Sequence, residues 1–79
     1  MFFIYIIEST LSGKYYIGCT DNINRRLIDH NKGLSKYTRN KGPWVLKYSE
    51  EYGNLSEARK REKQIKSWKK RKYIKKLFK

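Results

Sequence analysis

Residues 2–7, Phe-Phe-Ile-Tyr-Ile-Ile, form the longest apolar run of this 79-residue chain. Every position is aromatic or β-branched, which predicts a β-strand that is covered on both faces and is therefore central in its sheet. The run is far shorter than the roughly 20 apolar residues of a membrane-spanning helix, and nothing resembling a signal peptide precedes it. The single cysteine, Cys19, suits a reducing compartment and makes zinc binding unexpected. We therefore expect a soluble, cytoplasmic protein.

A returning strand is expected directly after this run. Residues 9–13 contain turn formers, and residues 14–19, Lys-Tyr-Tyr-Ile-Gly-Cys, complete a predicted hairpin. The register that we expect sets Tyr5 opposite Tyr16, and directly opposed residues share a face with Cβ atoms about 5 Å apart. Two tyrosine hydroxyls would then point into the same space, whereas a slip by one residue would separate them.

A helix from about Asn22 to Asn31 is predicted after the hairpin. N-cap formers precede a narrow apolar stripe there, and Gly33 ends the helix. Arg26 and His30 are four residues apart, so they are neighbours on one helical face. Residues 32–43 are a basic loop without periodicity, and long loops in small domains are often functional.

The remaining sequence predicts a third strand and two helices. Residues 44–52 alternate, with Trp44, Leu46 and Tyr48 on one side and a solvent-exposed face on the other. The next helix begins at Ser56, with Asn54 as a competing cap, and the last helix spans about residues 70–78. The order β-β-α-β-α-α predicts an α+β fold, a small three-stranded antiparallel sheet flanked by helices, in a single domain of residues 1–79.

The charge of the chain narrows its class of partner. Twenty Lys and Arg residues against seven acids give a net charge of +13, and residues 56–79 alone hold twelve cations against two acids. So high a density of positive charge predicts a polyanionic partner, and nucleic acid is the commonest partner of this kind. Anionic membranes are the alternative, but Trp68 and Tyr73 alternate with cations instead of forming one broad apolar face. We expect DNA, with RNA as an alternative, and no membrane; the sequence leaves open whether a protein partner exists and does not identify one.

One acid in this basic tail occupies an inward position. Ala58, Glu62 and Ile65 fall at i, i+4 and i+7 of the predicted helix, so its apolar stripe contains a carboxylate. Burial of an unpaired carboxylate costs several kcal/mol. Glu62 must therefore meet a metal, hydrogen-bond donors or a cation, and a structural ion pair is the plain alternative.

The string Tyr16-Ile17-Gly18, with Arg26 ten residues after its tyrosine and His30 fourteen after, resembles the GIY-YIG nuclease superfamily. The triplet Phe3-Ile4-Tyr5 is similar to the family's first motif in its last two letters, with Phe in place of glycine. Glu62 resembles the family's metal-binding glutamate. The similarity covers residues 2–77 and extends in particular to small stand-alone bacterial members related to the catalytic domain of the excinuclease of DNA excision repair.

The resemblance implies a divalent-metal-dependent DNA endonuclease that selects structure and has low sequence specificity. Glu62 would hold Mg²⁺, or Mn²⁺, because waters and substrate phosphate can complete the octahedron of such an ion. Arg26 would stabilise the negative charge that grows on the phosphate. The competing hypothesis is a catalytically inactive nucleic-acid-binding module on the same scaffold.

The resemblance also implies roles for four further residues. Tyr16 would be the general base on the attacking water, although a phenol with a pKa near 10 needs a neighbour that lowers it. Tyr5 would hydrogen-bond to Tyr16 or orient the water, and His30 would assist proton transfer or bind phosphate. Gly18 would be structural, because glycine inside a strand marks close approach by another group.

Cations outside this site are expected to contact the nucleic-acid backbone. They are Arg25, Lys36, Arg39, Lys41, Lys66, Lys69, Lys70 and Arg71. Trp44, Trp68 or Tyr37 would offer stacking surfaces for bases. The family often carries a further asparagine in its terminal helices, and no asparagine follows Asn54 here, so that contact is absent or replaced.

Overall fold

The computed structural model describes residues 1–78; Lys79, the last residue of the predicted domain, lies outside them. Its antiparallel sheet has the order β2-β1-β3, with β1 (Phe2–Ser9) between β2 (Tyr15–Thr20) and β3 (Trp44–Tyr52). The helical elements are α1 (Ile23–Asn31), α2 (Leu55–Ser67), α3 (Arg71–Lys75) and the 3₁₀ turn η1 (Lys76–Phe78). The predicted α+β fold and element order are confirmed, as is the central position of the first strand.

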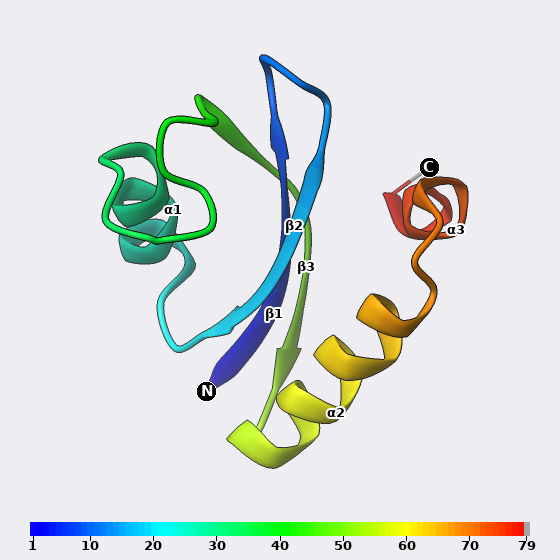
Figure 1. Ribbon diagram of the computed structural model, residues 1–79. Coiled ribbons are helices and arrows are strands. Elements are labelled where there is room, and N and C mark those ends of the chain that lie inside the picture. The colour runs from blue at the N-terminus through cyan, green and yellow to red at the C-terminus, as the bar shows by residue number, and fades with distance from the viewer. Residues whose placement is uncertain (79) are drawn as a thin grey trace.

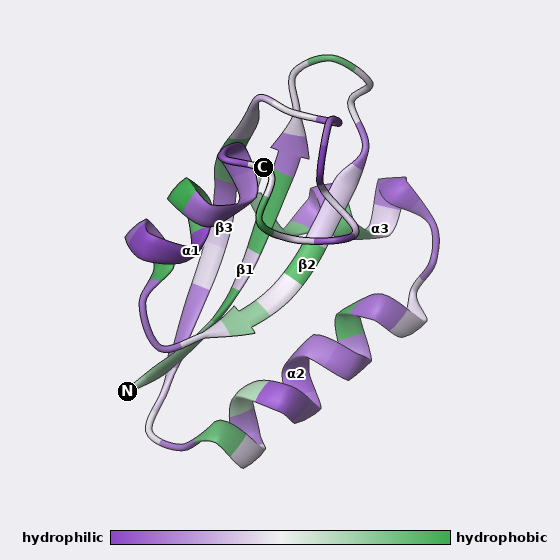
Figure 2. Ribbon diagram, turned by 60° about the vertical axis from the view of Figure 1, so that its left-hand side comes forward, coloured by the Kyte–Doolittle hydropathy of each residue, from purple (hydrophilic) through white to green (hydrophobic). Residues whose placement is uncertain are grey.

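The sheet separates two layers of helices (Figure 1). The first helix α1 and the loop after it cover one face, and α2 with α3 covers the other. Successive side chains of β1 point to opposite faces, so this one strand supplies both cores. The core under α2 consists of Ile4, Ile6, Ile17, Ala58, Ile65 and Ile74, and the core under α1 of Tyr5, Ile7 and Trp44. Figure 2 shows hydrophobic segments along the strands, beside a largely hydrophilic α2.

The third strand departs from the predicted alternation at Lys47. The register shifts by one residue between the β1 partners of Leu46 and Tyr48, so Lys47 is the extra residue of a β-bulge. The prediction that Tyr48 shares a side with Trp44 and Leu46 is therefore wrong. Tyr48 packs under α2, whereas Trp44 packs under α1.

The hairpin register also differs from the predicted one. Tyr5 lies opposite Gly18, and Tyr16 pairs with Ile7. Because this difference is two residues, both tyrosines still share a face, with ring centroids 6.4 Å apart. The Tyr5 ring lies across Gly18, where an added Cβ would be only 2.6 Å from the tyrosine Cζ. A glycine at this point lets a buried tyrosine of the central strand reach over the edge strand.

Two asparagines cap the long helices. The Asn22 side chain accepts a hydrogen bond from the Arg25 amide at 3.0 Å, and Asn54 accepts one from the Glu57 amide at 2.9 Å. The second helix therefore begins at Leu55 and not at Ser56. Within residues 1–78, no helix has the length and apolar character needed to cross a membrane.

Replacement of Gly18 by Ala should destabilise the protein by about 1–3 kcal/mol, because the new methyl group overpacks against Tyr5. Urea unfolding measures the loss. Gly53→Ala is the matched control, since nothing lies within 4 Å of a Cβ at that position. In a Tyr5→Val background, the loss of unfolding free energy caused by Gly18→Ala should fall to that of the control variant. An unchanged loss of unfolding free energy would contradict the steric explanation.

Candidate active site

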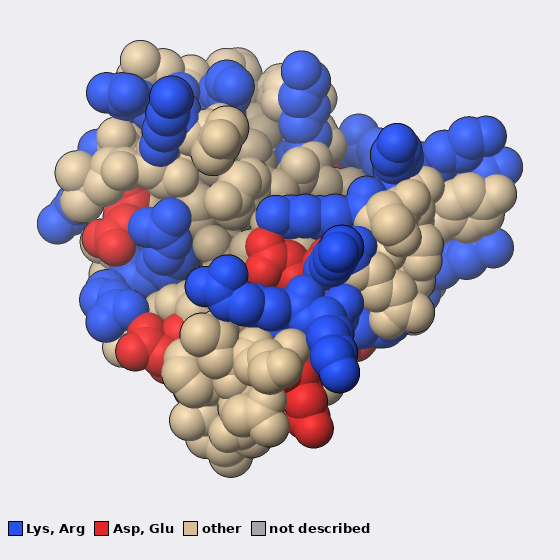
Figure 3. Space-filling view, turned by 60° about the horizontal axis from the view of Figure 1, so that its bottom comes forward, with Lys and Arg blue, Asp and Glu red and all other residues tan. Residues whose placement is uncertain are grey.

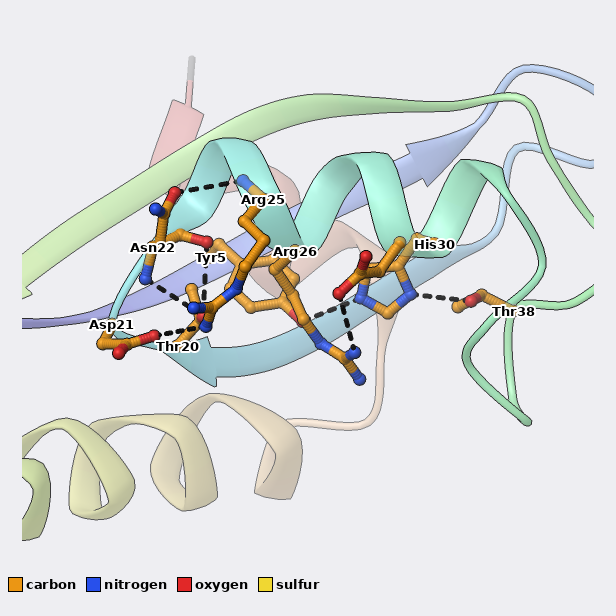
Figure 4. Close-up of polar contacts among 9 residues, drawn as sticks. Tyr5, Thr20, Asp21, Asn22, Arg25, Arg26, His30 and Thr38 are labelled. Atoms are coloured by element: carbon orange, nitrogen blue, oxygen red, sulfur yellow. Dashed lines mark hydrogen bonds and ion pairs between the residues drawn. The ribbon is translucent and has the colours of Figure 1, made fainter.

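A buried chain of hydrogen bonds joins β1, α1 and the loop after α1 (Figure 4). The Tyr5 hydroxyl lies 2.8 Å from His30 Nε2, and His30 Nδ1 lies 2.7 Å from Thr38 Oγ1. Tyr5 is 2% exposed, and His30 and Thr38 are each 1% exposed. Because each ring nitrogen has one partner, a neutral imidazole satisfies the chain in either tautomer.

Burial keeps this chain uncharged. It lowers the pKa of His30 to about 4, helped by the positive charge of Arg26 and opposed by Asp29. Burial also raises the pKa of Tyr5 to about 12, where Arg26 acts in the opposite direction. Both groups are therefore neutral near pH 7, and Tyr5 keeps its proton.

The geometry restricts what His30 can do. With both nitrogens occupied and 1% of its surface exposed, it presents no nitrogen to a phosphate. The expectation of a direct phosphate contact by His30 is therefore wrong, because the imidazole lies beneath the surface. His30 instead holds the hydroxyl of Tyr5 in place.

Tyr16 and Arg26 lie nearer to the surface. The half-buried Tyr16 ring meets His30 edge-on, with centroids 5.0 Å apart, and its hydroxyl has no hydrogen-bond partner within residues 1–78. The side chain of Arg26 is 33% exposed, and its only carboxylate neighbour among the described residues, Asp29, lies 3.9 Å away. This loose contact leaves the guanidinium able to bind an anion.

Glu62 approaches the same edge of the sheet from the other layer. Its side chain is 19% exposed and accepts a 2.7 Å hydrogen bond from the Lys66 ammonium. Its negative charge contributes to the raised pKa of Tyr5 and, after burial, to the raised pKa of Cys19 on β2. An open depression of about 330 Å³ surrounds this glutamate, lined by Arg59, Glu62, Lys63 and Lys66.

The donor set around Glu62 fits a hard cation better than a soft one. Within the part of the chain that the structure describes, no three His, Cys, Asp or Glu residues cluster as metal ligands. Zinc in proteins usually takes three or four such ligands, whereas Mg²⁺ accepts one carboxylate and keeps waters and substrate oxygens. Lys66 bonds only the Oε2 atom of Glu62, so the second carboxylate oxygen would be the one to approach an ion.

The cations expected to contact nucleic acid divide into two groups. Three of them meet acids: Arg25 donates to Asp21 at 2.6 Å, Arg71 to Glu8 at 3.0 Å and Lys66 to Glu62. The other five, Lys36, Arg39, Lys41, Lys69 and Lys70, are exposed. Figure 3 shows Lys and Arg side chains spread over one face with few acids among them. This surface suits the phosphate backbone of a nucleic acid.

The expected stacking residues also differ in position. Trp44 is 5% exposed and its indole donates to the Thr38 carbonyl oxygen at 3.1 Å. The prediction that Trp44 stacks on bases is wrong, because its ring belongs to the core. Tyr37 is 69% exposed and Trp68 is half-buried.

Thr38 is the member of the buried chain that the sequence did not identify. Its neighbours in the basic loop are exposed cations and a tyrosine, and threonine is a residue type that lies mostly at the surface. The single local signal was its position between Tyr37 and Arg39 in a loop without periodicity. Only the fold brings the hydroxyl to His30.

Known proteins resemble this chain over most of its length. Residues 1–76 match the family described as the GIY-YIG catalytic domain. A UPF0213 protein from Halobacterium salinarum is 42% identical over 67 residues, which are 84% of this chain and 86% of that protein. Another from Staphylococcus epidermidis is 42% identical over 67 residues, 84% and 80% of the two chains. The solution NMR structure of a UPF0213 protein from Bacillus halodurans has a TM-score of 0.60 and 32% identity, and the match covers 98% of this chain and 82% of that one.

Stability should fall as the pH drops from about 6.5 towards 4, by about 2–3 kcal/mol in total. The pKa of His30 is lower in the folded protein, about 4, than in an unfolded chain, about 6.5. The unfolded state therefore binds the extra proton in this interval, and the stabilisation present above pH 6.5 is lost below it. Urea unfolding between pH 7 and pH 5 measures the slope before most carboxylates titrate.

His30→Gln is the control for this slope, because His30 is the single histidine of the chain. The variant should be less stable at pH 7 but should show little change between pH 6.5 and pH 5. A slope equal to that of the natural protein would assign the pH dependence to other groups.

Proposed function

The chain belongs to the GIY-YIG catalytic domain family, and from this premise we propose that it is a divalent-metal-dependent endonuclease that hydrolyses phosphodiester bonds of DNA. What supports the proposal is the grouping of Tyr5, Tyr16 and Arg26 on the α1 side of β2. Glu62 lies on α2, which packs against the sheet from the other side. The net charge of +13 supports a polyanionic substrate.

Glu62 is the residue that would hold Mg²⁺ or Mn²⁺. Such an ion, when bound, neutralises charge on the phosphate and on the leaving oxygen. The open depression around Glu62 leaves room for a polymer to approach. Its three cationic neighbours, Arg59, Lys63 and Lys66, would draw the phosphate backbone towards the carboxylate.

Arg26 is the proposed phosphate ligand on the opposite side of β2. Its guanidinium has two donor edges that match the oxygens of a phosphate. The nearest carboxylate, Asp29, is 3.9 Å away, so substrate does not have to displace a close ion pair. Donors of this kind stabilise the charge that develops in the transition state.

The two tyrosines receive different roles. Tyr5, whose pKa is about 12, keeps its proton, and its buried hydroxyl bonds to His30. It would therefore act by fixing the position of the Tyr16 ring beside it. Tyr16, whose hydroxyl has no partner within residues 1–78, is the proposed acceptor of the proton from the attacking water, after it has released its own proton to solvent. His30 is a positioning residue, because it holds the Tyr5 hydroxyl and packs against the Tyr16 ring. Thr38 is a positioning residue that acts through its hydrogen bond to His30.

Recognition of the substrate should depend on shape more than on sequence. The exposed cations of the loop, Lys36, Arg39 and Lys41, and of the segment after α2, Lys69 and Lys70, suit phosphates, which carry no sequence information. Low sequence specificity and structure selectivity follow from this arrangement. The contact of Lys66 with Glu62 is what favours the competing hypothesis, a binding module that does not hydrolyse DNA.

Glu62→Gln tests the proposed function. Removal of the single carboxylate should lower metal-dependent nicking by more than about 100-fold, since even residues that only orient a metal ligand contribute 10–100-fold. DNA affinity in a chelator should change by less than about twofold. Nicking is measured on duplex, flap, branched and single-stranded DNA with Mg²⁺ or Mn²⁺.

The matched control is Glu57→Gln, which makes the same change of charge in the first turn of the same helix. It should keep full activity. Absence of metal-dependent nicking by the natural protein on all four substrates, with DNA binding retained, would support the binding module instead.

A further inference from the structure

An apolar groove lies beyond the candidate site, where α2 ends and α3 begins. It has a volume of about 420 Å³ and is lined by Trp68, Tyr73, Lys76 and Leu77. None of these residues takes part in the proposed hydrolysis. Tyr73 is 41% exposed and Trp68 is half-buried, so aromatic surface is accessible from solvent.

A sharp corner of the backbone builds this groove. Lys69 has a φ of 59°, in the left-handed region, which costs a non-glycine residue about 1–2 kcal/mol. The Lys70 amide donates to the Trp68 carbonyl oxygen at 2.6 Å across the same corner. The chain thereby turns from α2 into α3, and residues on the two sides of the corner line a common hollow.

The rim of the groove is cationic. The ammonium groups of Lys72 and Lys76 lie 5.3 and 5.4 Å from the centroid of the Tyr73 ring, and the Arg61 guanidinium lies 5.6 Å from that of Trp68. No acid follows Glu62 in the sequence. A ligand for this groove must therefore combine a flat apolar group with negative charge beside it.

We propose that this groove binds an unpaired nucleobase of a DNA strand, with the base against Trp68 and Tyr73 and the flanking phosphates against Lys72 and Lys76. Base stacking on aromatic side chains together with backbone contacts to cations is the usual mode of single-strand binding. Paired bases are stacked inside a duplex and cannot enter the groove. An anionic membrane fits less well, because interfacial binding needs a broad apolar face and this one is small and interrupted by lysines.

This inference rests on the proposed function and names its substrate class. Glu62 lies in α2 and Trp68 is the C-cap residue of that helix, six residues later and roughly 9 Å further along the axis. A strand anchored in the groove would need fewer than about three nucleotides to reach the carboxylate, at roughly 3.4 Å for each stacked nucleotide. The preferred substrates are therefore DNA molecules with a single-stranded segment close to the cleaved bond.

The test compares two oligonucleotides of equal length and charge, oligothymidylate and an abasic strand, in a chelator so that no cleavage occurs. Tryptophan fluorescence of the full chain reports binding at Trp68, because Trp44 is buried. Oligothymidylate should bind about 5- to 100-fold more tightly than the abasic strand. Tyr73→Ser should remove most of this preference and Tyr73→Phe should keep it. Leu11→Ser, a change at an exposed residue of the hairpin turn, should leave it intact.

Equal affinity for the two strands, or a preference that survives Tyr73→Ser in a folded variant, would overturn the groove assignment while the endonuclease proposal stands. Binding of neither strand would also overturn the groove assignment, whereas the nicking assay on the four DNA substrates decides the endonuclease proposal separately. Vesicles with phosphatidylserine give the third comparison. If they bind through Tyr73 and the oligonucleotides do not, the groove is a lipid site and the inference fails.

Discussion

The two hydrogen bonds that join His30 with Tyr5 and with Thr38 determine how this small protein assembles its site. A buried polar group without a partner costs about 1–3 kcal/mol, so strand, helix and loop must reach the imidazole together. The constraint extends further, because the Trp44 indole donates to the Thr38 carbonyl oxygen. The Asn31 side chain in turn bonds both the amide and the carbonyl of Trp44, at 2.7 and 3.1 Å. A twelve-residue loop is thereby fixed at the point where it meets the site.

The edge strand β2 explains how side chains from two layers meet in so short a chain. A protein of 79 residues buries only roughly 60–65% of its unfolded surface and does not enclose a large pocket. Here the groups lie beside an edge instead. Gly18 lets the Tyr5 ring lie across β2 on the α1 side. The helix that carries Glu62, α2, packs against β2 from the other side. An open edge suits a polymer, and the dense positive charge around it supplies attraction without sequence recognition.

The sequence predicted the parts of this arrangement that local patterns determine. The run at residues 2–7, the spacing from Tyr16 to Arg26 and the inward carboxylate at Glu62 led to the fold and to the family. The bulge at Lys47 was missed because alternation continues on both sides of it, and only pairing with β1 reveals the extra residue. Thr38 was missed because its partner lies eight residues away across a loop with no regular period. The burial of Trp44 was missed because it depends on contacts distant in the sequence. Its ring packs against Tyr5 and Ile7 under α1, and its indole donates to the loop residue Thr38.

The place where a divalent metal binds is the most direct measure of whether side chains converge at β2. Substoichiometric Mn²⁺ broadens NMR signals of nearby amides in the full chain. Convergence predicts that Glu62 and Cys19 broaden first and that residues 10–13, in the turn at the far end of the hairpin (Figure 1), stay sharp. Glu62→Gln should abolish the effect. Broadening centred on another acid, or unchanged in that variant, would contradict a metal-dependent site at this edge.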